Sequence, residues 1–558
     1  MHSLAVSQGM IPSSHCKCWL VFSRCIRMSA QTGIGATIDV PVIKVPKRLE
    51  KRVEEIRRMK ESEGEFQWQG RVFNARPGKE LISAKRKEFN YYQNQLFRTS
   101  VPQKLASHGW KHRKSRGDFF TLLAYRGNPS VQDGEIRGQS QLSFDDYGID
   151  RRLLTRLEDM DIRKPTIIQD LAIPVLMKGK NALFAAETGS GKTLAYLLPL
   201  LNSLLKLRDV CQNEDVGRPW SLILVPAQEL AHQVHSVVTN LSRDHGIVCE
   251  LLDGAGSLKL CKSTLEKPID VLVATSGRLN MSLKHRLFSL QSIRHTVIDE
   301  ADTLLDDSFK SSTVHILKKM EINQKPASPL SGSFGSQLIM AGATMPKQAT
   351  LALGEVLSEN SLTVLSTPHL HRIQPHINQK FLRLHTTDKA VTLLKILSQD
   401  ARKNTSVMIF CNEASTCNWV AYLLEENGFS CLRLNGAMKI QERRGVMEAY
   451  QSGSSNILVS TDIASRGIDT SRVEHIINFD FPNHMSDYIH RVGRVGRVSS
   501  RKGGRVTSFV VHKWDVDLVH KIETAVRTRE SLPRVDANIK RKHILRNTEI
   551  PFNQIMFE

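Results

Sequence analysis

The octapeptide Ala-Glu-Thr-Gly-Ser-Gly-Lys-Thr at residues 186–193 decides the fold of this chain. It follows a short apolar run at residues 181–186 and precedes a helix-length segment at residues 194–207, so we predict a strand, a tight loop and a helix. The glycines let backbone N–H groups close around phosphate groups, and the helix N-terminus adds positive potential. In such a loop Lys192 reaches the β- and γ-phosphates and Thr193 ligates Mg²⁺. The octapeptide therefore predicts a nucleoside triphosphate site.

A second stretch, His-Thr-Val-Ile-Asp-Glu-Ala-Asp at residues 295–302, places acidic residues at the end of an apolar run. An aspartate at a strand end, here Asp299, holds the metal of a phosphate-loop site, and the adjacent Glu300 orients or deprotonates the attacking water. Alone, this acid pair is also compatible with a helix N-cap. Together with the phosphate loop, it predicts hydrolysis of a nucleoside triphosphate.

Apolar runs alternate with helix-length segments over most of the chain. The first series lies at residues 181–186, 221–225, 270–274, 295–298 and 337–341, and the second at residues 407–410, 456–460, 475–478 and 506–511. Short continuous apolar runs separated by helices are typical of buried parallel strands. We therefore predict an α/β fold with two parallel-sheet domains in tandem, at residues 141–366 and 375–530. Pro368 and Pro375 break regular structure between them.

The chain of 558 residues carries 77 Lys and Arg against 56 Asp and Glu, a formal net charge of +21, and 41% of it is hydrophobic. This length is enough for two or three cores, and the apolar content excludes a mainly disordered chain. No apolar run approaches the roughly 18–20 residues of a membrane span. The nine cysteines form no CxxC pair, which favours reduced thiols over a zinc site. The charge favours a polyanionic partner, nucleic acid first, although merely basic proteins share such a balance.

The N-terminal zones differ from the rest of the chain. Residues 1–38 contain serines, Lys17, Arg24 and Arg27 but no acidic residue, which is typical of a mitochondrial transit peptide. A tail of chance composition is the alternative. Residues 39–140 form a basic N-terminal extension, and a short basic tail at residues 531–558 follows the second domain.

Within the extension, the basic segment at residues 111–116 adjoins Trp110, Phe119 and Phe120. Basic side chains interleaved with aromatic ones suit phosphate contact combined with base stacking. The alternative is an arm that docks on the following domain through its aromatic rings. The sequence leaves both interpretations open.

The Asp-Glu-Ala-Asp sequence at residues 299–302 resembles the signature of the DEAD-box RNA helicases of superfamily 2, and the resemblance covers about residues 141–530. The family's Q motif is matched by Lys-Pro-Thr-Ile-Ile-Gln at residues 164–169, and its isolated aromatic residue by Phe144. The resemblance implies two RecA-like domains that bind ATP. It also implies that Gln169 reads the adenine edge and that Phe144 packs on the base.

Two stretches of the second domain closely match family motifs. They are Thr-Asp-Ile-Ala-Ser-Arg-Gly-Ile-Asp at residues 461–469 and His-Arg-Val-Gly-Arg-Val-Gly-Arg at residues 490–497. In the family both face the phosphate loop across the interdomain cleft, which implies that Arg494 and Arg497 are arginine fingers and that Asp469 contacts the ribose. Such fingers contribute roughly 10³–10⁵-fold in rate. A solvated basic face is the alternative for the Arg-rich stretch.

These motifs together define the predicted site. The predicted catalytic residues are Lys192, Asp299, Glu300, Arg494 and Arg497. The residues expected to hold ATP are Phe144, Gln169, Ala186, Glu187, Thr188, Gly189, Ser190, Gly191, Lys192, Thr193, Gly467 and Asp469, and those expected to hold Mg²⁺ are Thr193 and Asp299. The resemblance implies RNA contacts at Gly254, Thr275, Arg278, Arg444 and Thr461.

The sequence departs from the family pattern at several positions. Gln228 stands where the family usually has an arginine on the RNA backbone, and a neutral amide releases no counterion. Ser276 replaces a proline, and Ala255 separates the family's adjacent glycines. Gly342 replaces the serine of a motif that links hydrolysis to strand separation. ATP turnover is therefore a more secure prediction than unwinding.

We predict an ATP-dependent RNA helicase with a monomeric core that clamps and remodels RNA. The rival function is an ATP-gated RNA-binding assembly scaffold with little unwinding activity. Within the family, Gly-Ala-Thr at residues 342–344 and Gly-Trp-Lys at residues 109–111 resemble an animal mitochondrial member of large mitoribosomal subunit assembly. This resemblance implies mitochondrial rRNA and ribosomal assembly intermediates as partners. It places the protein at RNA-processing sites of the mitochondrial matrix, with the nucleus as the alternative.

Overall fold

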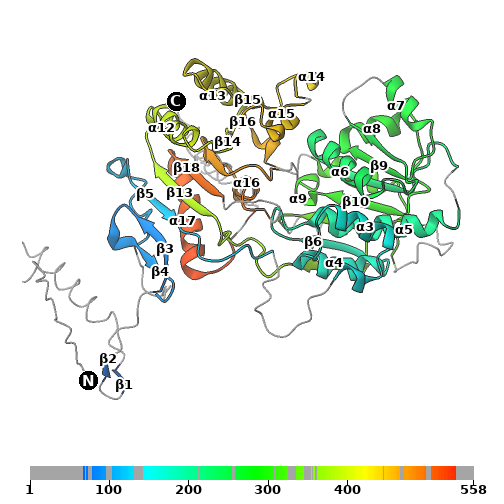
Figure 1. The fold of residues 1–558 in the computed structure, drawn as a ribbon, viewed down its shortest axis with the longest axis horizontal. Coiled ribbons are helices and arrows are strands. Elements are labelled where there is room, and N and C mark those ends of the chain that lie inside the picture. The colour runs from blue at the N-terminus through cyan, green and yellow to red at the C-terminus, as the bar shows by residue number, and fades with distance from the viewer. Residues whose placement is uncertain are drawn as a thin grey trace, which may run out of the picture. The chain divides into compact units, whose positions relative to one another are not determined.

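The structure is a computed structural model of the chain (Figure 1). Two short strands, β1 (Gln67–Trp68) and β2 (Arg71–Val72), pair within a unit at residues 1–75, and the remaining elements belong to a second unit. The structure describes these two strands and residues 78–95, 104–130, 143–211, 214–253, 258–306, 309–324, 335–344, 353–354, 356–358, 361–443, 445–465, 470–497, 504–533 and 535. The predicted transit peptide lies outside this part of the chain. Among the described residues, no helix combines the length and the apolar character that crossing a bilayer requires.

The first domain is built, within the described residues, on a seven-stranded parallel sheet with the order β12-β6-β11-β10-β7-β9-β8. Its strands are β6 (Asn181–Ala185), β7 (Ser221–Val225), β8 (Cys249–Leu252), β9 (Val271–Thr275), β10 (His295–Asp299), β11 (Gln337–Gly342) and β12 (Leu362–Ser366). The helices on one face are α3 (Arg151–Asp159), α4 (Ile167–Met177), α5 (Lys192–Arg208) and α6 (Gln228–Leu241). Those on the other face are α7 (Leu258–Leu265), α8 (Ser276–Lys284), α9 (Ala301–Leu304) and α10 (Lys310–Leu317).

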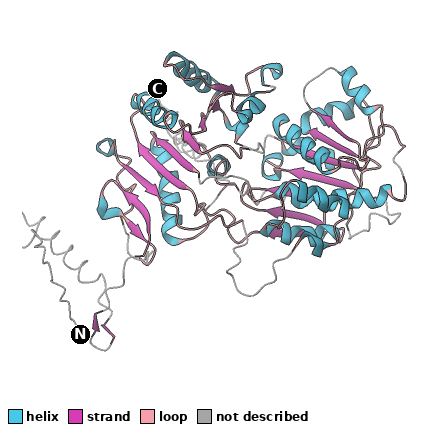
Figure 2. Ribbon diagram, viewed as in Figure 1, coloured by secondary structure: helices cyan, strands magenta, loops and turns pink. Residues whose placement is uncertain are grey.

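Helices on both faces explain why the predicted apolar runs coincide with strands (Figure 2). In β6, Phe184 enters the core under α5, and its neighbour Leu183 enters the core on the opposite face. All five predicted runs of this domain are strands. The two strands that the pattern missed, β8 and β12, lie at the sheet edges, where partial exposure permits a mixed sequence.

The second domain contains, in the described part of the chain, a nine-stranded sheet with the order β15-β16-β14-β17-β18-β13-β5-β3-β4. Its parallel strands are β13 (Asn378–Arg383), β14 (Val407–Phe410), β15 (Leu432–Leu434), β16 (Ile457–Ser460), β17 (His475–Asn478) and β18 (Arg505–Val510). Its helices are α12 (Asp388–Ala401), α13 (Ala414–Glu426), α14 (Ile440–Arg443), α15 (Val446–Ser452), α16 (Met485–Val492) and α17 (Lys513–Thr528). The two RecA-like parallel-sheet domains are thus confirmed.

The last three strands of this sheet come from the N-terminal extension (Figure 1). They are β3 (Glu80–Ala84), β4 (Tyr91–Tyr92) and β5 (Phe119–Leu122), and β5 pairs antiparallel with β13. The Phe120 ring stacks on Phe381 with 4.9 Å between centroids, and Trp110 is fully buried. The arm therefore docks through its aromatic rings, although on the second domain rather than on the domain that follows it. Rings buried in this way do not stack on RNA bases.

A buried carboxylate anchors the extension to α17. Glu523 accepts hydrogen bonds from the backbone N–H groups of Ala106 (2.6 Å) and Ser107 (2.9 Å), from the Ser107 hydroxyl (2.6 Å) and from Arg527 (2.7 Å). Glu523 is fully buried and Arg527 is 5% exposed. The pair thus satisfies backbone donors of the extension without contact with solvent.

We expect Glu523→Ala to lower the free energy of unfolding by about 3–5 kcal/mol, because it leaves the Arg527 charge buried without its partner. Urea unfolding of the full chain, followed by circular dichroism, measures this loss. The control is Glu425→Ala, which removes an exposed carboxylate from α13. Equal unfolding midpoints for the two variants would contradict the anchoring role.

Candidate nucleotide site and interdomain cleft

The phosphate loop lies between the carboxyl end of β6 and the start of α5, as predicted. Gly189 and Gly191 have φ angles of +79° and +90°, which side chains with a Cβ atom rarely adopt. The Thr188 and Ser190 hydroxyls are buried and have no hydrogen-bond partner in the described structure. Buried polar groups without partners carry a desolvation cost, and phosphate oxygens relieve it. The loop therefore suits a triphosphate.

Lys192 folds back onto the loop. Its Nζ atom donates to the carbonyl oxygens of Ala186 and Glu187, both at 2.8 Å. Burial lowers the pKa of Lys192, and the charges of Asp299 and Asp302 oppose this shift. A bound phosphate favours the charged amine in the same way, so this side chain is placed to hold the β- and γ-phosphates.

Asp299 and Thr193 approach the same tyrosine hydroxyl. Tyr196 Oη donates to Asp299 Oδ2 at 2.8 Å and is also hydrogen-bonded to Thr193. Burial raises the pKa of the Asp299 carboxyl, while the hydrogen bond from Tyr196 and the charge of Lys192 oppose this shift. Mg²⁺ in proteins commonly takes one carboxylate and a hydroxyl together with substrate phosphates. These two residues fit that role, and Mg²⁺ would neutralise phosphate charge there.

Glu300 occupies a strained position next to Asp299. Its φ angle is +50°, in the left-handed region, and its side chain is 8% exposed. Such a conformation costs about 1–3 kcal/mol in a residue with a Cβ atom and often marks a functional site. The conformation sets Glu300 at the carboxyl end of β10, beside the phosphate loop.

A buried network joins the first domain to α16. The backbone N–H and the hydroxyl of Thr344 donate to Asp302 Oδ2 at 2.9 and 2.8 Å, and His490 Nε2 lies 3.3 Å from the same oxygen. At Gly342, a Cβ atom would lie 2.9 Å from the Thr344 carbonyl oxygen. The family's serine therefore does not fit this backbone unless the segment shifts. The sequence did not reveal this reason for the glycine.

One of the two predicted arginine fingers, Arg497, lies against the phosphate loop. A Cβ atom on Gly189 would lie 2.6 Å from Cγ of Arg497, and one on Gly493 would overlap the Thr188 side chain. Arg494 is 3% exposed, and its Nε atom donates to the His490 carbonyl oxygen at 3.1 Å. The two glycines thus permit close approach of the two domains at the nucleotide site.

Arg491 was not predicted as a functional residue. It is fully buried, pairs with both carboxylate oxygens of Asp462 at 2.6 and 2.8 Å, and donates to Asn412 Oδ1 at 2.7 Å. It therefore joins the two family motifs of the second domain to the segment after β14. The Arg-rich sequence itself does not show which arginine turns inward.

The residues expected to hold adenine are buried in the first domain. Gln169 is 2% exposed, accepts from the Thr166 N–H at 2.9 Å and donates to the Gly191 carbonyl oxygen at 3.0 Å. Phe144 is 3% exposed within the core. Gln169 thus connects the Q motif to the phosphate loop, while its adenine contact and that of Phe144 stay predictions.

The predicted RNA residues are only partly within the described structure. Thr275 lies at the end of β9, and Thr461 follows β16. Arg278 is 8% exposed and lies 2.7 Å from Cys261 Sγ. The predicted residues outside the described part of the chain are Gly254, Arg444, Gly467 and Asp469.

Two long-range contacts near the cleft were missed by sequence reasoning. Arg443 on α14 pairs with Glu229 at the start of α6, and both side chains are largely buried. The Thr367 hydroxyl, where the interdomain linker begins, donates to Glu187 of the phosphate loop at 2.9 Å. No local pattern marks either pair, because the first depends on how the two domains meet and the second on the pairing of β12 with β6.

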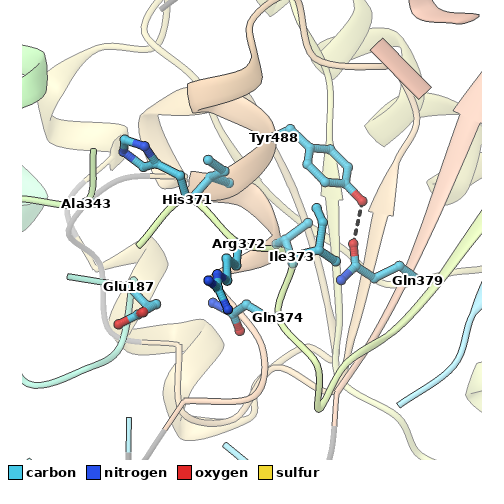
Figure 3. Close-up of a pocket in the computed structure, with 10 residues that line it drawn as sticks. Glu187, Ala343, His371, Arg372, Ile373, Gln374, Gln379 and Tyr488 are labelled. Atoms are coloured by element: carbon cyan, nitrogen blue, oxygen red, sulfur yellow. Dashed lines mark hydrogen bonds between the residues drawn. The ribbon is translucent and has the colours of Figure 1, made fainter. Parts of the chain in front are cut away.

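The linker continues beside a small pocket next to the phosphate loop. Glu187, Ala343, the linker residues 371–374, Gln379 and residues of α16 line it (Figure 3). Figure 3 shows the Tyr488 hydroxyl, which donates to Gln379 Oε1 at 2.6 Å. The linker therefore contacts elements of both domains near the site.

A phosphate loop on one RecA-like domain and inward-facing arginines on a second define a two-domain nucleoside triphosphatase. Two family models match the chain, DEAD/DEAH box helicase at residues 166–352 and Helicase conserved C-terminal domain at residues 388–499. The chain is 42% identical over 517 residues to a Mus musculus protein named probable ATP-dependent RNA helicase DDX28, covering 90% of this chain and 94% of that protein. The Homo sapiens protein of the same name is 40% identical over 537 residues, covering 93% and 97%.

Solved structures share the fold. S. cerevisiae Dbp5 bound to RNA and ADP BeF3 matches with a TM-score of 0.57 and 24% identity, over 70% of this chain and 94% of that one. Mss116p bound to ssRNA and AMP-PNP matches with a TM-score of 0.61 and 20% identity, over 71% and 79%. The chain belongs to the DEAD-box family of ATP-dependent RNA helicases and is an ATP-hydrolysing enzyme.

Proposed function

We propose that this enzyme clamps and remodels mitochondrial rRNA during assembly of the large ribosomal subunit, with Mg²⁺ and ATP closing the clamp. The observation that carries the clamp mechanism is the position of Arg497 against Gly189, because it makes the hydrolysis site depend on closure of two domains. If ATP contacts both domains and RNA does so as well, each ligand favours the closed cleft. The binding of one ligand then strengthens the binding of the other.

The proposed substrate and compartment rest on composition and resemblance. Residues 1–38 contain no acidic residue, which suits import into mitochondria, and the strongly basic chain suits a ribosomal RNA partner. A fluorescent fusion of the full chain is expected in the matrix, and the same fusion without residues 1–38 outside it. Nuclear accumulation of the full chain would contradict the proposed compartment.

Steady-state ATPase activity of the full chain tests the proposed coupling to RNA. We expect structured rRNA fragments to stimulate turnover at least about tenfold, because closure delivers the arginines. Matched DNA should stimulate weakly. Turnover that ignores RNA, or responds equally to DNA, would contradict the proposed function.

The alternative is an assembly scaffold in which ATP gates RNA binding with little unwinding. Gly342 favours it, since the family's serine hydroxyl is absent from the motif that meets Asp302 and His490. Gln228 favours it as well, because it replaces a charged contact to the RNA backbone with a neutral one.

A further inference from the structure

The topology of the second sheet brings two turns of the extension to the carboxyl ends of its parallel strands, which form one edge of the sheet. β5 runs antiparallel to β13, so the turn before Phe119 lies at the carboxyl end of β13. There Arg383 N–H donates to the Asp118 carbonyl oxygen at 2.9 Å, and Gly117 N–H donates to the Arg383 carbonyl oxygen at 2.8 Å. The end of β3 reaches the same place, where Lys85 N–H donates to the Phe119 carbonyl oxygen at 3.0 Å.

Thr461, for which the family resemblance implies a contact with RNA, lies at the same edge. Thr461 follows β16 and Asn412 follows β14, and the carboxyl ends of parallel strands meet at one edge. His512 follows β18 at the same edge, and its exposed ring stacks on Trp514 with 4.4 Å between centroids. An RNA strand can therefore run from Thr461 along the carboxyl ends of β14, β17, β18 and β13 to the two turns. Such a path does not cross either face of the sheet.

The two turns, at residues 85–88 after β3 and residues 113–118 before β5, contain more basic than acidic side chains. We call their basic residues the basic edge. Its members are Lys85, Arg86, Lys87, Arg113, Lys114 and Arg116. The turns touch, since Lys85 Nζ donates to the Gly117 carbonyl oxygen at 2.9 Å. Asp118 lies 3.9 Å from Lys85 and 3.4 Å from Arg86 and, with Glu88, supplies negative charge among them. The nearby Lys111 pairs with Asp517 at 2.5 Å and is not counted in the basic edge.

We propose that the basic edge is an accessory RNA-binding surface that holds the sugar-phosphate backbone of RNA extending beyond the clamp. Because Trp110 and Phe120 are buried, its cations meet phosphates without base stacking, so binding is independent of sequence and sensitive to salt. Five strand spacings of about 4.8 Å separate β16 from β5, or about 24 Å. This distance corresponds to roughly seven stacked nucleotides at about 3.4 Å each. The inference rests on RNA as the ligand of the core.

The test compares RNA of different lengths on the full chain with a non-hydrolysable ATP analogue. The variant Lys87→Ala, Arg113→Ala, Lys114→Ala, Arg116→Ala removes four exposed cations of the basic edge. For wild type, we expect about ten added nucleotides on the 5′ or the 3′ side of a short RNA to lower Kd about tenfold or more at low salt. The variant should lose this gain, and its slope of log Kd against log salt should fall by about 3.

A matched control removes the same charge elsewhere. Lys178, Lys180, Arg402 and Lys403 are exposed at the amino edges of the two sheets, and their joint replacement by alanine should leave the length gain unchanged. The proposal is overturned if neither RNA extension strengthens binding to wild type, or if the basic-edge variant keeps the gain. Failure of wild type to bind the short RNA would instead contradict the proposed function. Equal unfolding midpoints establish that all variants are folded.

Discussion

Glu300→Gln is expected to lower kcat for RNA-stimulated ATP hydrolysis by about 10²–10⁴-fold and to leave ATP-dependent RNA binding near the wild-type value. The amide keeps the size of the carboxylate but does not accept a proton from the attacking water. Glu300 is 8% exposed beside Asp299, at the end of β10, and the substitution leaves Asp299, the proposed Mg²⁺ ligand, unchanged. Steady-state phosphate release gives kcat, and the Kd of RNA measured with and without ATP gives the ATP dependence of RNA binding.

The matched control is Glu321→Gln, which changes an exposed carboxylate of the same domain and should leave kcat unchanged. Wild-type turnover by Glu300→Gln would remove Glu300 from the reaction. The same variant also separates the two candidate functions in cells. If Glu300→Gln supports ribosome assembly at the normal rate, ATP turnover is dispensable for assembly. The scaffold function then explains the role of the protein in cells better than the helicase function.

The strands and the phosphate loop were predictable because their causes are local. Strand β9 is buried on both faces, so its sequence is continuously apolar up to Thr275. The loop needs positive φ angles at Gly189 and Gly191, and glycine is the residue that supplies them. Each feature is encoded within a few consecutive residues.

The addition of β5 to β13 was not predictable from the sequence. Phe120 and Phe381 are far apart in the chain, and a basic segment with aromatic residues reads equally well as an RNA-stacking arm or as a docked one. The choice depends on the edge of β13, which needs a partner for its backbone groups. A single sequence does not show that need.

The nucleotide site shows the same difference between local and long-range causes. Lys192, Asp299 and Glu300 stand in short motifs whose residue types identify their chemistry. Arg443 pairs with Glu229 only because the two domains meet, so neither residue is distinguished by its neighbours in the sequence. The residues expected to act on the nucleotide are therefore easier to predict from a sequence than the contacts that couple the domains.

Arg497→Ala is expected to lower RNA-stimulated kcat by about 10³–10⁵-fold, with a much smaller effect on the Kd of RNA. Carbon atoms of the Arg497 side chain lie against Gly189, so this residue of the second domain reaches the phosphate loop of the first. A cation delivered there stabilises charge that develops at the γ-phosphate, and this stabilisation is larger in the transition state than in the ground state. ATPase rates of the variant and of wild type at saturating RNA and ATP measure this loss of kcat.

Two further variants distinguish a finger from a general electrostatic effect. Arg497→Lys keeps the charge but loses the planar fork, so it should recover only part of the rate. Arg402→Ala removes an exposed arginine beyond the end of α12 and should leave kcat unchanged. If Arg497→Ala stays within tenfold of wild type, or if Arg402→Ala loses as much, the rate does not depend on a guanidinium at the phosphate loop. Closure would then act only by positioning RNA.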